Sequence, residues 1–198
     1  MNILVLGPQG SGKGTQARRI NAMYGLPHIA SGDIIREMKE LPTDLGRELK
    51  AVHDRGDLVA DDLMIRLIGD RLSRGDTVGG FILDGFPRTL PQAEALDELL
   101  RELGRKVDAV LDFQVADHEV LLQRMLRRAA EENRSDDTPD VIRRRLELYE
   151  RETAPLIDYY RSHQANVVGI HADRTIEEVF REIADALDEV QRHSKVEA

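Results

Sequence analysis

The stretch Gly7-Pro-Gln-Gly-Ser-Gly-Lys-Gly-Thr15 follows the apolar run Ile3-Leu-Val-Leu6 and leads into the helix-favouring segment Gln16-Ala-Arg-Arg-Ile20. A strand, a glycine-rich turn and a helix start in this order form a cradle for phosphate, because backbone N–H groups and the positive helix end converge on an anion. The spacing Gly-x-x-x-x-Gly-Lys fits the P-loop pattern, in which Lys13 supplies a mobile charge for the outer phosphates. The stretch therefore predicts a phosphate-binding loop rather than a turn that only joins a strand to a helix.

The residue after Lys13 departs from the commonest form of this loop. Gly14 stands where most such loops place a Ser or Thr that binds magnesium directly, and Thr15 comes one position late. Mg²⁺ keeps much of its hydration shell in proteins. We therefore expect carboxylates elsewhere in the chain to hold the metal, through water.

An acid at the end of a second apolar run is the leading candidate for that task. The run Gly80-Phe-Ile-Leu-Asp84 is a short strand pattern that ends in Asp84. Ligands of parallel α/β sheets sit outside the carboxyl ends of the strands, which should place Asp84 beside the loop that begins at Gly7. By itself such an acid can be a turn former, but together with a P-loop that lacks its own Ser or Thr ligand it predicts a site for hydrated magnesium.

Seven arginines fall between Arg124 and Arg145 in a chain whose net charge is -9. For Arg127, Arg143 and Arg144 we expect a solvated helix face, the usual meaning of such a cluster. Arg145 differs, because its helical neighbours three and four residues away are carbon-rich and no anionic partner lies within a turn. A ligand phosphate is the partner that this pattern suggests.

Composition limits the remaining possibilities. The 198 residues, 41% hydrophobic and 33% charged, fit one globular domain with a sizeable core. The negative net charge disfavours nonspecific binding to nucleic acid or to anionic membranes. Without cysteine, disulfides and thiolate metal sites are excluded. The chain starts directly with a strand pattern and has no apolar run of membrane-spanning length, so we expect a cytoplasmic protein.

Three short polar segments indicate the starts of helices. Ser31-Gly-Asp33 is typical of a helix N-terminus, where simple capping is the plain explanation for Ser31 and Asp33. Asp61 or Asp62 is expected to cap the next helix. Thr175-Ile-Glu-Glu178 predicts a capping box before the last helix.

Motifs along essentially the whole chain resemble those of the nucleoside monophosphate kinases, and among them the adenylate kinases with a short lid. The matching segments are Gly10-Ser-Gly-Lys-Gly-Thr-Gln16, Ser31-Gly-Asp-Ile-Ile-Arg36, Gly56-Asp-Leu-Val59, Leu83-Asp-Gly-Phe-Pro-Arg-Thr89 with Gln92, Arg134-Ser-Asp-Asp137 and Thr153-Ala-Pro-Leu-Ile-Asp-Tyr-Tyr160. The Asp-Gly-Phe-Pro-Arg run in register with a P-loop is very specific.

The resemblance implies a three-layer α/β fold of the P-loop NTPase type, with a central parallel sheet flanked by helices, in one domain over residues 1–198. The implied core covers residues 1–29, 60–124 and 137–198, with a nucleoside monophosphate-binding helical insertion at 30–59 and a short lid at 125–136. The implied reaction is the reversible transfer of the terminal phosphoryl group of ATP to AMP, giving two ADP, with Mg²⁺ as cofactor. A zinc site is not expected, because the long lid that carries one in some relatives is missing.

The resemblance also implies a role for individual residues. Those implied in catalysis are Lys13, Asp84, Arg88, Arg124, Arg134 and Arg145. Those implied in ATP binding are Gly10, Ser11, Gly12, Lys13, Gly14, Thr15, Arg124, Arg128 and Arg174, the last through its backbone carbonyl. Those implied in AMP binding are Ser31, Arg36, Asp57, Leu58, Val59, Gly85, Phe86, Pro87, Arg88, Gln92, Arg134 and Arg145, with Gln92 reading the adenine edge. Asp84, supported by Asp33, would order the waters of magnesium.

Several alternatives stay open at this point. A UMP/CMP kinase shares most of these residues, and Ser31 stands where many adenylate kinases have Thr. A regulatory module that binds nucleotides without catalysis, and a purely structural α/β domain, are the rivals from other classes. We expect a monomer whose partners are ATP, AMP and ADP.

Overall fold

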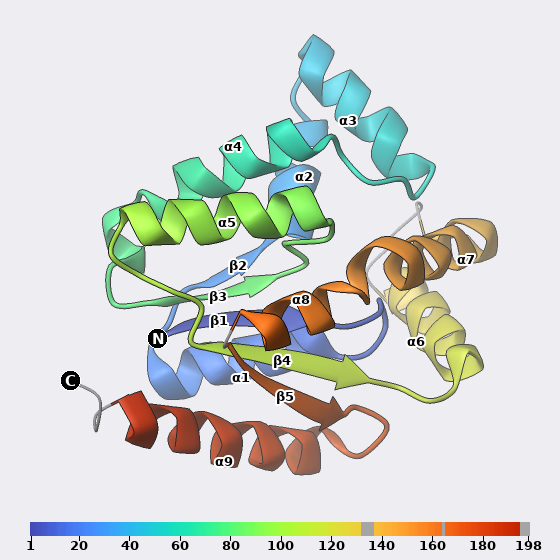
Figure 1. The fold of residues 1–198 in the computed structure, drawn as a ribbon. Coiled ribbons are helices and arrows are strands. Elements are labelled where there is room, and N and C mark those ends of the chain that lie inside the picture. The colour runs from blue at the N-terminus through green and yellow to red at the C-terminus, as the bar shows by residue number, and fades with distance from the viewer. Residues whose placement is uncertain (132–136, 164, 195–198) are drawn as a thin grey trace.

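The computed structural model describes residues 1–131, 137–163 and 165–194. In this part of the chain the strands form one parallel sheet of five, in the order β2-β3-β1-β4-β5 (Figure 1). The strands are β1 (Asn2–Leu6), β2 (His28–Ala30), β3 (Phe81–Asp84), β4 (Ala109–Gln114) and β5 (Asn166–His171). The predicted parallel sheet is confirmed.

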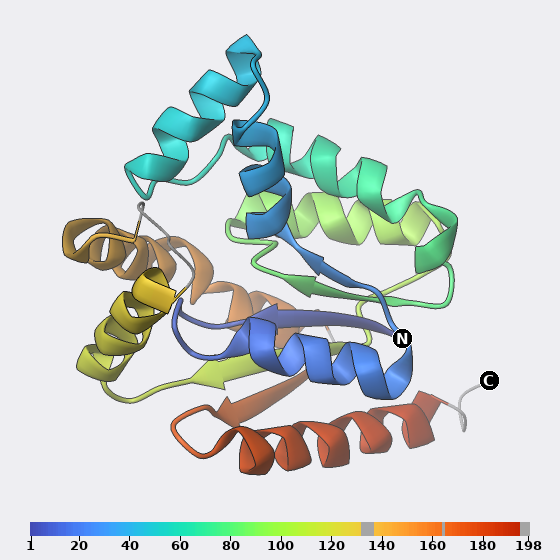
Figure 2. The ribbon, with the colours of Figure 1, turned by 180° about the vertical axis from the view of Figure 1, so that it is seen from behind.

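Helices cover both faces of this sheet. They are α1 (Lys13–Tyr24), α2 (Ser31–Lys39), α3 (Asp44–Asp54), α4 (Asp61–Leu72), α5 (Leu90–Glu102), α6 (His118–Glu131), α7 (Pro139–Leu148), α8 (Leu156–Ser162) and α9 (Ile176–Ser194), with short turns η1 (Gly75–Thr77) and η2 (Tyr149–Thr153). Helices α4, α5 and α8 pack on one face, and α1 and α9 pack on the other (Figures 1 and 2). The three-layer architecture expected from the sequence is therefore present. Along the described ranges, no helix is both long and apolar enough to cross a bilayer.

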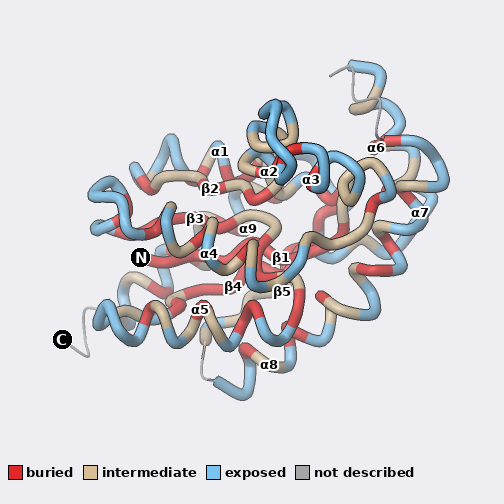
Figure 3. Tube along the Cα trace, turned by 90° about the horizontal axis from the view of Figure 1, so that it is seen from above, coloured by how far each residue is buried: buried red, intermediate tan, exposed pale blue. Residues whose placement is uncertain are grey.

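Strand β1 shows why the sheet is buried on both sides. Leu4 and Leu6 point into the core under α4, α5 and α8, whereas Ile3 and Val5 point into the core under α1 and α9. All four side chains are at most 2% exposed, and Figure 3 shows the strands as the buried centre of the molecule. A continuous apolar run is the pattern required of a parallel strand with helices on both faces.

The functional edge of the sheet follows from the chain connections. Helix α1, which follows β1, lies on one face, and α5, which follows the neighbouring strand β3, lies on the other. The crevice between the carboxyl ends of two such strands is where open α/β sheets bind ligands. Val5 pairs with Asp84 in the register, so the loop from Gly7 and the acid at the end of β3 lie side by side at this crevice.

Two helix pairs stand over the same edge. Helices α2 and α3 project from it on one side and α6 and α7 on the other (Figure 1). Most residues of α3 are exposed (Figure 3), and only Gly46 and Leu49 of that helix are buried. The boundaries expected for the nucleoside monophosphate-binding insertion and the lid stay predictions, and part of the lid, residues 132–136, lies outside the described residues.

Helix starts show where local rules hold and where they fail. The capping box at Thr175 is confirmed, since the Thr175 backbone N–H donates to Glu178 Oε2 at 3.0 Å and Glu178 N–H to Thr175 Oγ1 at 3.3 Å. Simple capping is wrong for Ser31 and Asp61. The N-cap residues there are Ala30 and Ala60, without a side-chain bond, because the Ser31 and Asp61 side chains bond to segments distant in sequence, described below.

The inner face of α9 offers a test of the sheet packing. Ile183 is fully buried against the core shared with α1, so Ile183→Ala should lower the free energy of unfolding by about 2–5 kcal/mol through lost transfer energy and a cavity. Urea denaturation measures the change. Met23→Ala, at a side chain that is 56% exposed, is the matched control and should stay within about 0.5 kcal/mol. Equal losses in both variants would contradict this packing.

Candidate active site

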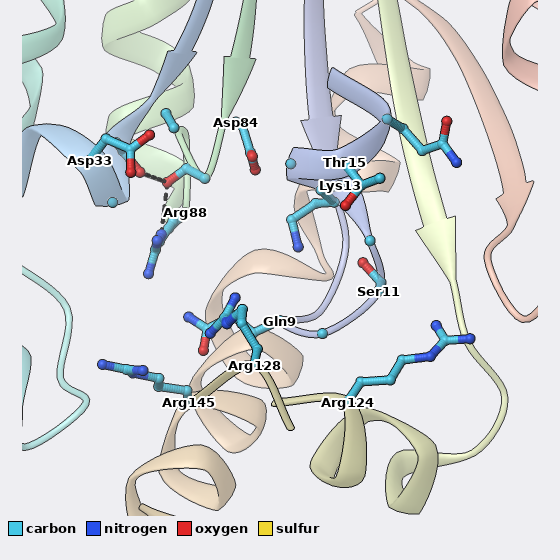
Figure 4. Close-up of a pocket in the computed structure, with 18 of the residues that line it drawn as sticks. Gln9, Ser11, Lys13, Thr15, Asp33, Asp84, Arg88, Arg124, Arg128 and Arg145 are labelled. Atoms are coloured by element: carbon cyan, nitrogen blue, oxygen red, sulfur yellow. Dashed lines mark hydrogen bonds between the residues drawn. The ribbon is translucent and has the colours of Figure 1, made fainter. Parts of the chain in front are cut away.

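A cavity of about 550 Å³ opens at the carboxyl edge of the sheet, beneath the two projecting helix pairs. Its walls come from segments far apart in the sequence, and charged side chains point into it from both sides (Figure 4). Of the residues that the resemblance assigns to catalysis or to binding of nucleotide or metal, it is lined by Gly10, Ser11, Gly12, Lys13, Gly14, Thr15, Ser31, Asp33, Arg36, Asp57, Leu58, Val59, Asp84, Gly85, Arg88, Gln92, Arg124, Arg128, Arg145 and Arg174.

The structure does not bring every predicted residue to this cavity. Phe86 is 1% exposed and packs in the core instead of lining the wall. Pro87 lines a smaller neighbouring pocket, together with Thr153. Arg134 lies outside the described residues.

The loop from Gly7 has the backbone geometry that its glycines were expected to permit. Gly10 and Gly12 have φ of 84° and 92°, in the left-handed region that favours glycine. A Cβ on Gly7 would lie 2.7 Å from the Phe113 carbonyl oxygen, so the loop passes too close to β4 for any side chain there. The helix α1 then begins at Lys13, with its N-terminus directed at the cavity.

Lys13 binds the loop's own carbonyl groups. Its Nζ donates to Gly7 O at 2.8 Å and to Pro8 O at 2.7 Å. Burial lowers the pKa of Lys13 to about 8, with Arg88 and Arg128 adding to the effect and Asp84 opposing it. A charged ammonium group that is desolvated and surrounded by cations is stabilised by an incoming anion.

Four buried polar atoms at the cavity have no hydrogen-bond partner within the described part of the chain. They are Gln9 Oε1, Ser11 Oγ, Gln16 Oε1 and Arg128 Nε. Buried polar groups in folded proteins are nearly always paired. Their gathering around the glycine loop is the pattern expected where ligand atoms complete the bonding.

Asp84 lies at the end of β3, facing Lys13 across the cavity (Figure 4). Burial alone would raise the pKa of Asp84, but His28, Lys13 and Arg88 together hold it below its usual value, so the group is a carboxylate. His28 Nε2 lies 3.4 Å from Asp84 Oδ2. A charged carboxylate beside a phosphate-binding loop fits the oxygen ligands that Mg²⁺ and its water shell prefer.

Asp33 is a weaker fit for the same metal. Its carboxylate forms an ion pair with Arg36 three residues on, and its side chain is 61% exposed. Over residues 1–131, 137–163 and 165–194, no group of three or more His, Cys, Asp or Glu side chains is arranged to hold a metal ion. Of the two predicted acids, Asp84 therefore has the more suitable surroundings.

The carbonyl oxygen of Gly85 connects two of the predicted acceptor-side residues. It accepts from Ser31 Oγ at 2.7 Å and from Arg88 Nε at 2.7 Å. Gly85 has φ of 77°, and a Cβ there would lie 2.7 Å from Ser31 Oγ. Ser31 thus fixes the start of α2 to the loop after β3, and the same carbonyl sets the direction of the Arg88 guanidinium.

Two arginines on the opposite wall share one buried acid. Arg128 donates to Asp137 Oδ2 at 2.7 Å, and Arg145 forms an ion pair with the other oxygen. The Asp137 side chain is fully buried, and that of Arg145 is 10% exposed. Arg145 also donates to His53 O at 3.2 Å. The sequence suggested a ligand phosphate as the anionic partner of Arg145, and the structure adds Asp137, which lies eight residues back in the sequence and therefore beyond one helical turn. Phosphate binding by Arg145 stays a prediction.

A third wall lies near the end of β5. Arg124 donates to Ala172 O at 3.0 Å, and Gln16 Nε2 donates to Ile176 O at 2.9 Å. The Arg174 guanidinium points to Glu182, where Arg174 Nη2 donates to Glu182 Oε2 at 2.7 Å. Only the backbone carbonyl of Arg174 was predicted to contact a ligand. The ion pair involves the side chain alone, so the role of the carbonyl stays a prediction.

The predicted acceptor segment 57–59 lies between the two helix pairs. Asp57 accepts from Arg55 Nε at 3.0 Å and from Arg144 Nε at 3.3 Å. The bond to Arg55, followed by Arg144, holds the pKa of Asp57 below its usual value. The Asp57 side chain therefore joins the segment after α3 to α7, and residues 57 to 59 line the cavity.

Sequence reasoning gave no role to some residues that shape the cavity. Ile35 and Met64 add apolar wall beside Val59, and Asp137 anchors both arginines. Ile35 and Met64 lie on the apolar faces of their helices. The sequence pattern there does not distinguish a residue that packs in the core from one that contacts a ligand. Asp137 had a signal, since it ends the quoted run Arg134-Ser-Asp-Asp137.

A glycine loop with its lysine, an acid at the end of the neighbouring strand and convergent arginines define a P-loop phosphotransferase. The model of the family described as "Adenylate kinase" matches residues 5–165. The chain is 47% identical over 189 residues to the adenylate kinase of Maricaulis maris, covering 96% of this chain and 100% of that protein. It is 46% identical to the Leifsonia xyli subsp. xyli enzyme (94% and 93% covered) and 40% identical to that of Archaeoglobus fulgidus (96% and 100%), both also named adenylate kinase. The chain belongs to the adenylate kinase family.

The pKa of Lys13 generates a test of the phosphate loop. With its pKa lowered to about 8, the Lys13 amine of the free protein is neutral to a greater extent at about pH 9 than at about pH 7.5. Bound phosphates raise that pKa, so ATP binding should take up a larger fraction of one proton at about pH 9 than at about pH 7.5. Titration calorimetry in buffers of different ionisation enthalpy measures the uptake. Lys13→Met should abolish it, and unchanged uptake in that variant would assign the proton to another group.

Proposed function

We propose that this chain catalyses the reversible transfer of the terminal phosphoryl group of ATP to AMP, giving two ADP. One observation carries the proposal. Cationic side chains from positions 13, 88, 124, 128 and 145 line a single cavity beside a phosphate loop. Two nucleotides bound with their phosphates facing each other place a row of negative charge in the middle of the site. Cations spread along the cavity match such a row better than they match the phosphates of a single nucleotide.

The mechanism that this arrangement supports is in-line displacement. A phosphate oxygen of AMP attacks the γ-phosphorus of ATP, and the bond to the β,γ-bridging oxygen breaks, with that oxygen leaving on ADP. The protein has little covalent work and contributes positioning and electrostatic stabilisation. Lys13, Arg88, Arg124, Arg134 and Arg145 are proposed to carry the positive charge. Arginine suits the task because its planar fork holds phosphate through two bonds.

The two nucleotides are assigned to different walls. For ATP we propose Gly10, Ser11, Gly12, Lys13, Gly14, Thr15, Arg124, Arg128 and the Arg174 carbonyl. For AMP we propose Ser31, Arg36, Asp57, Leu58, Val59, Gly85, Arg88, Gln92, Arg134 and Arg145, with Phe86 and Pro87 shaping the loop from behind. The unpartnered Ser11 Oγ and Arg128 Nε support the ATP assignment.

Mg²⁺ is the proposed cofactor, and when bound with ATP it supplies positive charge to the phosphate oxygens. Asp84 is proposed to hold its hydration shell, with Asp33 in support. The low pKa of Asp84 favours this role, because only the carboxylate form accepts hydrogen bonds from metal-bound waters at both oxygens.

Closure is proposed to exclude water during transfer. The segments predicted to close are 30–59, which contains α2 and α3, and 125–136, of which residues 125–131 are the end of α6. The position of α2, α3 and the end of α6 over the cavity edge supports this, since Arg36 and Arg128 line the cavity from these helices. We further propose a cytoplasmic monomer acting on free nucleotides, and the net charge of -9 argues against nucleic acid or anionic membranes as partners.

Arg88→Ala and Lys13→Ala should each lower turnover by about a hundredfold or more, the loss expected when one electrostatic donor worth roughly 3 kcal/mol is removed. A coupled assay of ADP formation from ATP and AMP measures the change. Arg101→Ala is the control, because Arg101 is exposed and pairs with Glu98 away from the cavity. Near-normal turnover in either cavity variant would refute the assignment.

An acceptor panel separates the proposal from its rivals. With ATP as donor, AMP should give a kcat/KM at least about tenfold above those of CMP, UMP and GMP, because the polar edge of a misfitting base leaves buried groups unpaired. Preference for CMP or UMP would indicate a UMP/CMP kinase. ATP binding without turnover of any acceptor would indicate a regulatory module.

A further inference from the structure

Gln92 has both ends of its side-chain amide held by the protein. The residue lies in the first turn of α5, is 2% exposed and lines the cavity. Its Nε2 donates to Asp61 Oδ1 at 2.7 Å, and its Oε1 accepts from the Arg88 backbone N–H at 2.8 Å. One N–H and one oxygen lone pair of the amide remain for a ligand.

These two partners permit one orientation of the amide. A carboxylate only accepts hydrogen bonds, so Asp61 requires the nitrogen end, and a backbone N–H only donates, so Arg88 requires the oxygen end. A rotation by 180° would set oxygen against oxygen at Asp61 and donor against donor at Arg88. The Asp61 carboxylate is itself fixed, because Thr89 Oγ1 donates to the same oxygen at 2.9 Å.

Orientation of this amide decides which bases it can pair with. The edge of adenine offers an N6 amino donor and an N1 acceptor, whereas hypoxanthine and guanine offer an O6 acceptor and an N1–H donor, the reverse pattern. A freely rotating glutamine amide serves either pattern. An amide fixed at both ends serves one, and a base with the reverse pattern leaves two buried polar groups unpaired, which is costly.

We propose that Asp61 is a positioning residue that gives the acceptor site its preference for adenine over 6-oxopurines, by holding the Gln92 amide in one orientation. This rests on the proposed function, in which Gln92 reads the base of AMP. Asp61 does not line the cavity and acts through Gln92. Its carboxylate serves this long-range contact instead of capping α4.

The test is Asp61→Asn, which keeps the shape and can present a donor or an acceptor to Gln92. The ratio of kcat/KM for AMP to that for inosine monophosphate (IMP) should fall by about tenfold or more, the worth of one net hydrogen bond. Most of the change should appear as a lower KM for IMP, and the KM for ATP should stay constant. Asp62→Asn is the matched control, an exposed acid in the same turn, and should leave the ratio unchanged.

A second variant separates the failure of this inference from the failure of the proposed base reading. Gln92→Ala should collapse the AMP to IMP ratio, and adding Asp61→Asn to it should change the ratio no further, since Asp61 acts through Gln92. If Gln92→Ala collapses the ratio but Asp61→Asn alone preserves it, the positioning role is overturned. If Gln92→Ala preserves the ratio, Gln92 does not read the base and the inference falls with that part of the proposed function. Because both substrates are assayed on one preparation, a loss of folded protein cancels in the ratio.

Discussion

Repulsion among like charges in a confined space is the constraint around which this molecule is built. Lys13, Arg88, Arg128 and Arg145 line one cavity, while Asp84 and the buried Asp137 are the carboxylates that partly neutralise them. Burial, together with the neighbouring cations, lowers the pKa values of Lys13 and Arg88, so the charged forms of both side chains are less stable here than in water. Such a site is relieved by an anion of high charge, and a polyphosphate provides that charge in an extended form.

The sheet makes this concentration of charge possible. Adjacent parallel strands whose helices leave on opposite faces open a crevice at their carboxyl ends. The glycine loop after β1 enters the crevice from one side and Asp84 from the other, at a position fixed by the pairing of Val5 with Asp84. Because the strands are buried on both faces, they are closely packed and hold the glycine loop and Asp84 side by side at the edge of the sheet.

The sequence predicted what depends on local patterns and missed what depends on tertiary contact. Apolar runs gave the strands, and the spacing of glycines around Lys13 gave the phosphate loop, since both are set by neighbouring residues. Ser31 and Asp61 stand where helix caps belong, yet their side chains bond to Gly85 and Gln92. No acidic residue stands three or four residues from Arg145 in the sequence, because its partner Asp137 lies in the segment before α7. Periodicity carries no information about bonds of that kind.

Arg88 contacts both parts of the proposed acceptor site, the part that binds phosphate and the part that recognises the base. Its guanidinium faces the cavity and is held by Gly85 O, its backbone N–H holds the oxygen end of the Gln92 amide, and its carbonyl accepts from Thr153 at 2.9 Å. Phosphate attraction alone is tolerant of the base, since any nucleotide carries the same charges. In the proposed reaction, the Gln92 amide that reads the base and the Arg88 guanidinium that binds phosphate are joined by one hydrogen bond, so a base that displaces Gln92 Oε1 would leave the partly buried Arg88 backbone N–H without its partner.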